Sequence, residues 1–259
     1  MPLLHSLHSG LLAYWPLHEP SGSRLSVMGD NSLLTLTDNN TVTGNPGIVE
    51  DASQFTAANS EYLSVADNAL LSMGDIDMFM AIWVYLDTKP AESEILSKDN
   101  GASQREYAVR YLGGGTDRFN LLISGNGTAN TQQNANTLGS PSTATWYFIC
   151  AWHDSVANTI NIRVNMGGVD SAAHTTGIFD GTSALNIGRS PFGAGTYLNG
   201  RACEAGIWKG RILTTSEQLW LYNNGKGRTY PFDGRYSPIV SPRANGLMKR
   251  RNRLTGVAN

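Results

Sequence analysis

The chain has 259 residues, of which only 15% are charged, and its formal net charge is −2 at pH 7. Glycine is abundant, and no apolar run approaches the ~18 residues that a membrane-spanning helix needs. This composition excludes a membrane-spanning helix and a strongly basic domain, and it is typical of many short strands joined by tight turns.

The N-terminal region is apolar but is not a signal peptide. It lacks a basic n-region and a small-residue cleavage site, and Trp15-Pro16 interrupts it. Apolar residues alternate from Leu11 to Leu17, which predicts a first strand. Export through the Sec pathway is therefore not expected.

Further strands are predicted at short intervals along the chain. They cover residues 33–37, 62–65, 78–86, 94–97, 107–112, 119–124, 145–153, 159–166, 184–188 and 203–208. Turn signals such as Asn-Gly and Gly-Gly separate them, and the polar residues 126–136 are expected to form a long surface loop.

Three of these strands indicate the architecture. Residues 78–86 (MFMAIWVYL) and 145–153 (TWYFICAWH) are continuously apolar, whereas residues 159–166 (TINIRVNM) alternate between apolar and polar. A fully buried strand beside a half-buried one predicts a sheet stacked on a second sheet, that is, an all-β sandwich. The apolar strand runs also predict four core tryptophans: Trp83, Trp146, Trp152 and Trp208.

One helix is predicted, over residues 215–223. Thr214 and Glu217 have the spacing of a capping box, and Asn224-Gly225 follows as a stop signal. Cys150 and Cys203 both fall within predicted strands, where free buried thiols are favoured and a disulfide stays possible if the strands are neighbours.

The C-terminal segment differs in charge from the rest of the chain. Residues 234–259 hold six basic residues and no acidic ones, so residues 1–233 carry 13 basic against 21 acidic groups, a net charge of −8. Two prolines and little apolar surface indicate that this segment does not fold alone. We therefore divide the chain into a β-sandwich, 1–233, and a basic arm, 234–259, which we expect to bind neighbouring subunits. The basic residues assigned to this contact are Arg243, Lys249, Arg250, Arg251 and Arg253.

An ordered set of motifs resembles the laminin-G-like and pentraxin branch of the concanavalin A-like jelly rolls. The set covers about residues 10–230. Its members are Ala13–Leu17, Ala52–Phe55 with Glu61–Val65, the strand around Trp83, Trp146–Trp152 with Ile160–Val164, Leu185–Arg189, Leu198–Gly200, Glu204–Trp208 and Leu213–Gln218. The resemblance implies a two-sheet antiparallel jelly roll with one short helix near the C-terminal end.

The resemblance also implies a calcium site that this chain does not keep. Pentraxin-type modules place an Asp-Asn pair before an E-I-L strand and an acidic cluster in a later loop. Here Glu92-Ser93 precedes Glu94, and Arg189-Ser190-Pro191 occupies the loop position. Calcium needs six to eight oxygen ligands, so no cofactor is expected, although a calcium site elsewhere stays possible.

Catalytic residues are not evident in the sequence. A glycosidase needs two carboxylates about 5–10 Å apart, and the candidates considered are Asp75 with Asp77, before a strand, and an isolated Glu204. A solvated turn and a polar strand face are the favoured interpretations of these residues. The five histidines show no metal-ligand spacing, and we predict a non-enzymatic protein.

Aromatic residues are the candidates for ligand binding. Tyr107, Tyr111, Phe192 and Tyr197 could form a platform that stacks on sugars, the alternative being that they fill the core or the edge of the sandwich. The basic arm lacks interleaved aromatic residues, so nucleic-acid binding is not expected.

These features predict a binding or structural module. We expect a virion surface component of a phage or virus, either a capsid decoration or a tail-associated protein, that forms a homo-oligomer, contacts other virion proteins and adheres to glycans. The alternatives are a secreted carbohydrate-binding or adhesion module of lectin type and, less favoured, a glycosidase.

Overall fold

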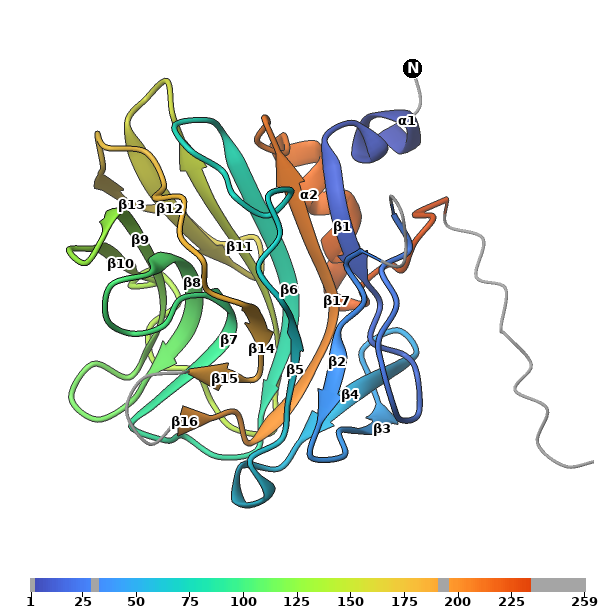
Figure 1. Cartoon of the computed structure of the whole chain (residues 1–259). Helices are drawn as coiled ribbons and strands as arrows, with labels where there is room; N and C mark the ends of the chain where they lie inside the picture. The colour runs from blue at the N-terminus through green and yellow to red at the C-terminus, as the bar shows by residue number, and fades with distance from the viewer. Residues whose placement is uncertain (1–2, 29–32, 191–195, 234–259) are drawn as a thin grey trace, which may run out of the picture.

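The computed structural model describes residues 3–28, 33–190 and 196–233. Two antiparallel sheets pack face to face as a sandwich, with two short helices beside the larger sheet (Figure 1). This arrangement confirms the predicted fold class. The basic arm and Phe192 lie outside the described residues.

The larger sheet has eight strands. They are β1 (Leu11–Trp15), β3 (Thr43–Pro46), β4 (Asp51–Phe55), β6 (Met78–Leu86), β11 (Trp146–Asp154), β12 (Thr159–Val164), β13 (Asp170–Ala173) and β17 (Gly200–Lys209). Their order is β13-β12-β11-β6-β17-β4-β3, and β1 pairs with the second half of β17.

The second sheet has seven strands. They are β2 (Thr37–Asn39), β5 (Tyr62–Val65), β7 (Glu92–Lys98), β8 (Arg105–Leu112), β9 (Arg118–Gly127), β10 (Thr131–Asn134) and β14 (Leu185–Ile187), in the order β10-β9-β8-β7-β14-β5-β2. A separate small pair joins β15 (Arg189–Ser190) to β16 (Thr196–Tyr197). Because β10 lies within residues 126–136, the expectation of a long loop there was wrong.

The core lies between the two sheets. Strand β12 contributes Ile160, Ile162 and Val164, which confirms its predicted alternation. Alternate residues of β6 face the same core, and they are Met78, Met80, Ile82, Val84 and Leu86.

The eight-stranded sheet is also buried on its outer face. There the side chains of Phe79, Trp83, Phe148 and Trp208 pack with residues of helix α1 (Leu3–His8) and of the region that begins with α2 (Thr215–Tyr222). Burial on both faces explains why the sequence of β6 is apolar throughout rather than alternating. The seven-stranded sheet has no such cover in the described part of the chain, and its outer face is polar.

Helix α2 begins as the capping box predicts. The backbone N–H of Glu217 donates to Thr214 Oγ1 at 3.3 Å, and the N–H of Thr214 donates to Glu217 Oε2 at 2.7 Å. The structure also contains helical elements that were not predicted. They are α1 and the short 3₁₀ turns η1 (Ala57–Asn59) and η2 (Asn223–Gly225). In the described residues no helix is long and apolar enough to cross a membrane.

Two further expectations concern buried side chains. Trp83, Trp152 and Trp208 are buried as predicted, but Trp146 is half-buried beside Tyr85, and its assignment to the core was wrong. Strand β6 separates the strands that carry the two cysteines, Cys150 on β11 and Cys203 on β17. Both thiols are free and buried, and burial raises their pKa.

Candidate functional site

A row of polar side chains crosses the outer face of the seven-stranded sheet. Glu94 on β7 pairs with Arg110 on β8, which pairs with Asn120 on β9, and Asn120 pairs with Asn134 on β10. Directly paired residues project from the same face of a sheet, so the strand register alone brings these four side chains together.

Hydrogen bonds connect most of this row. Arg110 Nη1 lies 2.7 Å from Glu92 Oε1, and Arg110 Nε donates to Asn120 Oδ1 at 2.8 Å. Asn120 Nδ2 then donates to Asn134 Oδ1 at 2.7 Å. The guanidinium of Arg110 is therefore held in position by a carboxylate on one side and an amide on the other.

Glu94 is the exception in this row. Its side chain is buried, the residue being only 2% exposed, and its Oε2 has no hydrogen-bond partner. Burial, with the charge of Asp99, raises the pKa of Glu94 to about 8 against the opposing effects of Ser97 and Arg110. The carboxyl group is therefore neutral at pH 7, whereas Glu92 pairs with a cation.

Two cavities lie near this row, the first on the outer face and the second toward the sheet edge at β10 and His174. The first, about 110 Å³, is lined by Glu92, Glu94, Asp99, Gly101, Arg105, Arg110, Leu122, Asn130 and Gln132. The second, about 190 Å³, is lined by Gly125, Asn126, Ala129, Asn130, Thr131, His174 and Thr176. Asn130 lines both, so the two cavities are adjacent, and together we call them the polar groove.

The sequence interpretation missed Glu92 and Glu94 as site residues. It placed the strand at residues 94–97, so that Glu92 fell outside it, whereas β7 begins at Glu92. Two glutamates at positions i and i+2 of one strand share a face. The prediction considered Asp75 with Asp77 as the acidic pair with i, i+2 spacing, and it overlooked Glu92 with Glu94. The sequence E-S-E at residues 92–94 was the signal for this second pair.

The other acidic candidates have structural roles. Asp75 is exposed, and Asp77 Oδ1 accepts hydrogen bonds from the N–H and hydroxyl of Ser155, which fixes the turn after β11. Glu204 does not lie on a polar strand face as expected. It is 3% exposed, at an irregularity in the pairing of β17 with β6 where its φ is 53°.

Three residues of the proposed aromatic platform, Tyr107, Tyr111 and Tyr197, are described by the structure, and none of the three is exposed. Tyr107 and Tyr111 are at most 1% exposed and face the core between the sheets, so their assignment as ligand-binding residues was wrong. Their hydroxyls are also engaged, by Leu71 O at 3.1 Å and Asp117 Oδ1 at 2.7 Å. Tyr197 is half-buried next to Tyr62.

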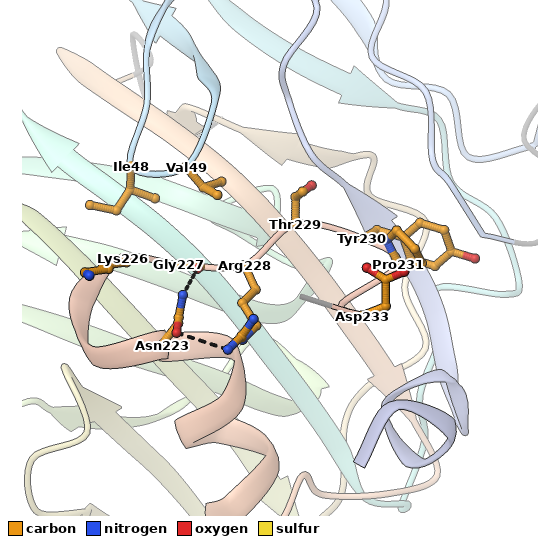
Figure 2. Close-up of a pocket in the computed structure, with 10 residues that line it drawn as sticks. All are labelled: Ile48, Val49, Asn223, Lys226, Gly227, Arg228, Thr229, Tyr230, Pro231 and Asp233. Carbon is orange, nitrogen blue, oxygen red and sulfur yellow. Dashed lines mark hydrogen bonds between the residues drawn. The ribbon is translucent and has the colours of Figure 1, made fainter. Parts of the chain in front are cut away.

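A larger cavity, of about 260 Å³, lies near α2 and is shown in Figure 2. Ile48 and Val49 form one wall, and the chain from Asn223 to Asp233 forms the other. Figure 2 shows Asn223 and Arg228 pointing toward each other, and Arg228 Nη2 donates to Asn223 Oδ1 at 3.1 Å. The Arg228 guanidinium also stacks on Trp220, so this side chain is already engaged.

A histidine bridge supports both walls of the cavity in Figure 2. His18 Nδ1 lies 2.7 Å from Glu50 Oε2, and His18 Nε2 lies 2.7 Å from Glu204 Oε1. An imidazolium can donate to a carboxylate from each of its ring nitrogens, and this geometry fits that form. Glu50 follows the wall residue Val49, and Tyr14 joins Glu204 to the other wall through its contact with Arg228 O.

This bridge predicts a pH-dependent stability. Although burial opposes the charge, the hydrogen bond and charge of Glu204, together with Glu50 and Glu19, raise the pKa of His18. Its contribution is then fully present below pH 6.5 and is lost as the pH rises through the folded-state pKa. We expect the difference in unfolding free energy between the parent and His18→Gln to shrink from pH 6 to pH 9 in urea titrations. A constant difference would contradict the imidazolium bridge.

The family model of the concanavalin A-like lectin/glucanase superfamily matches residues 57–218, more than half of the chain. The chain belongs to this superfamily. No curated protein sequence matches it.

Solved structures of the same fold are only distantly similar in sequence. Domain 4 of AbnA, a GH43 extracellular arabinanase from Geobacillus stearothermophilus in complex with arabinotriose, is 13% identical, with a TM-score of 0.63 over 85% of this chain and 99% of that one. The binding domain of Paraclostridial Mosquitocidal Protein 1 is 14% identical, with a TM-score of 0.66 over 86% and 53%. The binding domain of Botulinum Neurotoxin DC in complex with SialylT is 11% identical, with a TM-score of 0.58 over 83% and 51%.

The toxin comparisons cover only part of those proteins. The chain spans about half of the length of each toxin binding domain. At these identities the comparisons establish the fold of this family member and nothing about its ligand. The described residues contain no cluster of three or more His, Cys, Asp or Glu side chains suited to a metal ion. Arg189, at the calcium-loop position, stacks on the ring of Tyr62 at 4.6 Å.

Proposed function

We propose that this family member is a non-catalytic glycan-binding module and that the polar groove is its binding site. The observation that carries the proposal is the row of paired carboxyl, guanidinium and amide groups across four strands, beside a cavity that Glu94 and Arg110 line. Such groups donate to and accept from sugar hydroxyls, and the strands hold them rigidly.

The shape of the groove supports a chain of sugars over a single one. Two depressions joined at Asn130 provide adjacent subsites, and exposed amides line their junction. Gln132 Nε2 donates to Asn130 Oδ1 at 2.7 Å, so the two amides are aligned with each other. The likeness to an arabinanase domain in complex with arabinotriose agrees with an oligosaccharide ligand.

The alternative function for this site is hydrolysis of the bound glycan. A retaining glycosidase uses two carboxyl groups about 5–5.5 Å apart, one as acid and one as nucleophile, and Glu94 and Glu92 are two carboxyl groups that line the same cavity. However, Glu92 pairs with Arg110 at 2.7 Å, which stabilises its charge and lowers its reactivity as a nucleophile. Binding without turnover is therefore the expected result.

The test is calorimetric titration with arabinotriose, xylotriose and cellotriose after a glycan-array screen. The double variant Asn130→Ala/Gln132→Ala should lose about tenfold to hundredfold in affinity, because each lost hydrogen bond contributes roughly 0.5–1.5 kcal/mol. Lys226→Ala, at the cavity of Figure 2, is the matched control and should bind as the parent does. Equal affinities of parent and double variant, or release of reducing sugar that disappears in Glu94→Gln, would overturn the proposal.

A second proposal is that the protein is a virion surface component. It rests on the separation of charge between a body of −8 and the basic residues of the C-terminal segment, which gives neighbouring copies complementary surfaces. Salt should weaken this attraction.

Truncation after Asp233 tests the virion proposal. The shortened chain should unfold at the same urea concentration as the parent but lose self-assembly or particle attachment in sedimentation at low salt. Unchanged assembly at low and high salt would show that the arm is not needed for it.

A further inference from the structure

We propose that the polar groove selects uncharged sugars over acidic ones and that Glu94, whose buried Oε2 has no hydrogen-bond partner, is its specificity-determining residue. This inference rests on the proposed function of the groove. It goes further by naming the class of glycan and the group that selects it.

The charged side chains that line the groove are paired with one another. Besides Glu94, its carboxyl groups are those of Glu92 and Asp99, and its cations are Arg105 and Arg110. Glu92 pairs with Arg110 at 2.7 Å, and Asp99 Oδ1 lies 3.9 Å from Arg105 Nε. Each cation of the lining therefore already has a carboxyl group beside it.

Several of the N–H donors of both cations are also engaged within the protein. Arg105 Nη1 donates to Thr128 O at 2.7 Å, and its Nη2 donates to Gly101 O. Arg110 uses Nε for Asn120 Oδ1 and Nη1 for Glu92. Each cation already lies beside a carboxylate, so a sugar carboxylate would lose its hydration for an attraction that is partly neutralised, whereas a hydroxyl costs much less to desolvate than a charge.

The carboxyl group of Glu94 is incompletely hydrogen-bonded. A buried polar atom without a partner costs free energy, and Oε2 of Glu94 is such an atom at the wall of the groove. A neutral carboxyl group both donates and accepts, as a sugar hydroxyl does, so the two groups complement each other.

Binding of a sugar in the groove should depend on the protonation of Glu94. Asp99 and Glu92 face Glu94 with the same sign of charge, Arg110 with the opposite sign, and Ser97 supplies a hydrogen bond. A ligand over the groove removes more water from Glu94 and so disfavours its ionised form further. By linkage, affinity should be constant below the free-state pKa of about 8 and should fall above it.

The experiment compares the parent with Glu94→Gln, which cannot ionise, and Glu94→Met, which can neither donate nor accept. Calorimetry at pH 6 to 9.5 would use the neutral trisaccharides above, together with trigalacturonic acid and sialyllactose as acidic probes. Circular dichroism and a urea midpoint would establish that each variant is folded.

We expect the parent to bind its best neutral trisaccharide at least tenfold more tightly than either acidic probe. Its affinity should fall about tenfold between pH 7 and pH 9.5, since one proton linked to binding changes affinity by up to tenfold per pH unit. Glu94→Gln should lack this decline, and Glu94→Met should bind at least tenfold more weakly at pH 7.

The outcomes separate the two proposals. Equal affinity for neutral and acidic sugars, or the same pH profile in the parent and Glu94→Gln, would overturn this inference and leave the glycan-binding module intact. Absence of binding to every saccharide on the array, at every pH, would overturn both.

Discussion

Glu94→Gln should stabilise the protein by about 3 kcal/mol at pH 7. The folded-state pKa of about 8 exceeds the ordinary value of 4.5, so between these values the folded chain holds a proton that the unfolded chain releases. Stability therefore falls by about 1.4 kcal/mol per pH unit across this window and levels off above it. Glutamine resembles the protonated form at all pH values and removes the effect.

Urea denaturation from pH 4 to pH 9 measures this prediction. The two proteins should have similar unfolding free energies near pH 4 and should diverge as the pH rises. Glu92→Gln is the matched control on the same strand, and it should bring no gain because Glu92 is partly exposed and paired with Arg110. A difference between the parent and Glu94→Gln that does not change with pH would mean that Glu94 ionises normally.

Trp83→Ala should destabilise the protein by about 3–5 kcal/mol, the usual cost of removing a large buried aromatic side chain. Trp83 is 2% exposed on the outer face of β6. Its ring stacks on Tyr222 at 5.7 Å and 9° and lies 5.1 Å from the ring of Phe148. The substitution would leave a cavity between the eight-stranded sheet and the end of α2.

The urea midpoint of Trp83→Ala measures this cost, and Trp146→Ala is its control. Trp146 is only half-buried, so its loss should cost clearly less than the loss of Trp83. Equal midpoints for Trp83→Ala and the parent would show that the contact between the sheet and α2 contributes little to stability.

Local patterns in the sequence were sufficient for the fold class. The alternation in β12 identifies a half-buried strand, because successive side chains of a strand point to opposite faces. The continuous apolar run of β6 indicates burial on both faces, and the spacing of Thr214 and Glu217 locates the start of α2. Each of these signals depends on residues within one element.

It was harder to predict which face of a strand points toward the core. In β8, Tyr107 and Tyr111 alternate with Arg110, so the sequence shows that the tyrosines share one face and the arginine lies on the other. It does not show which face meets the second sheet. The tyrosines face inward because the opposite face joins the polar row of Glu94, Asn120 and Asn134.

The candidate site depended on tertiary structure. Glu94, Arg110 and Asn120 come together through the register of three strands, and the neutral state of Glu94 follows from burial that no local pattern reports. His18 meets Glu50 and Glu204 from distant parts of the chain. Sequence periodicity determined which residues form strands, because that is a short-range property. Strand register and the cover over each sheet determined which side chains meet, because both depend on contacts between residues far apart in the chain.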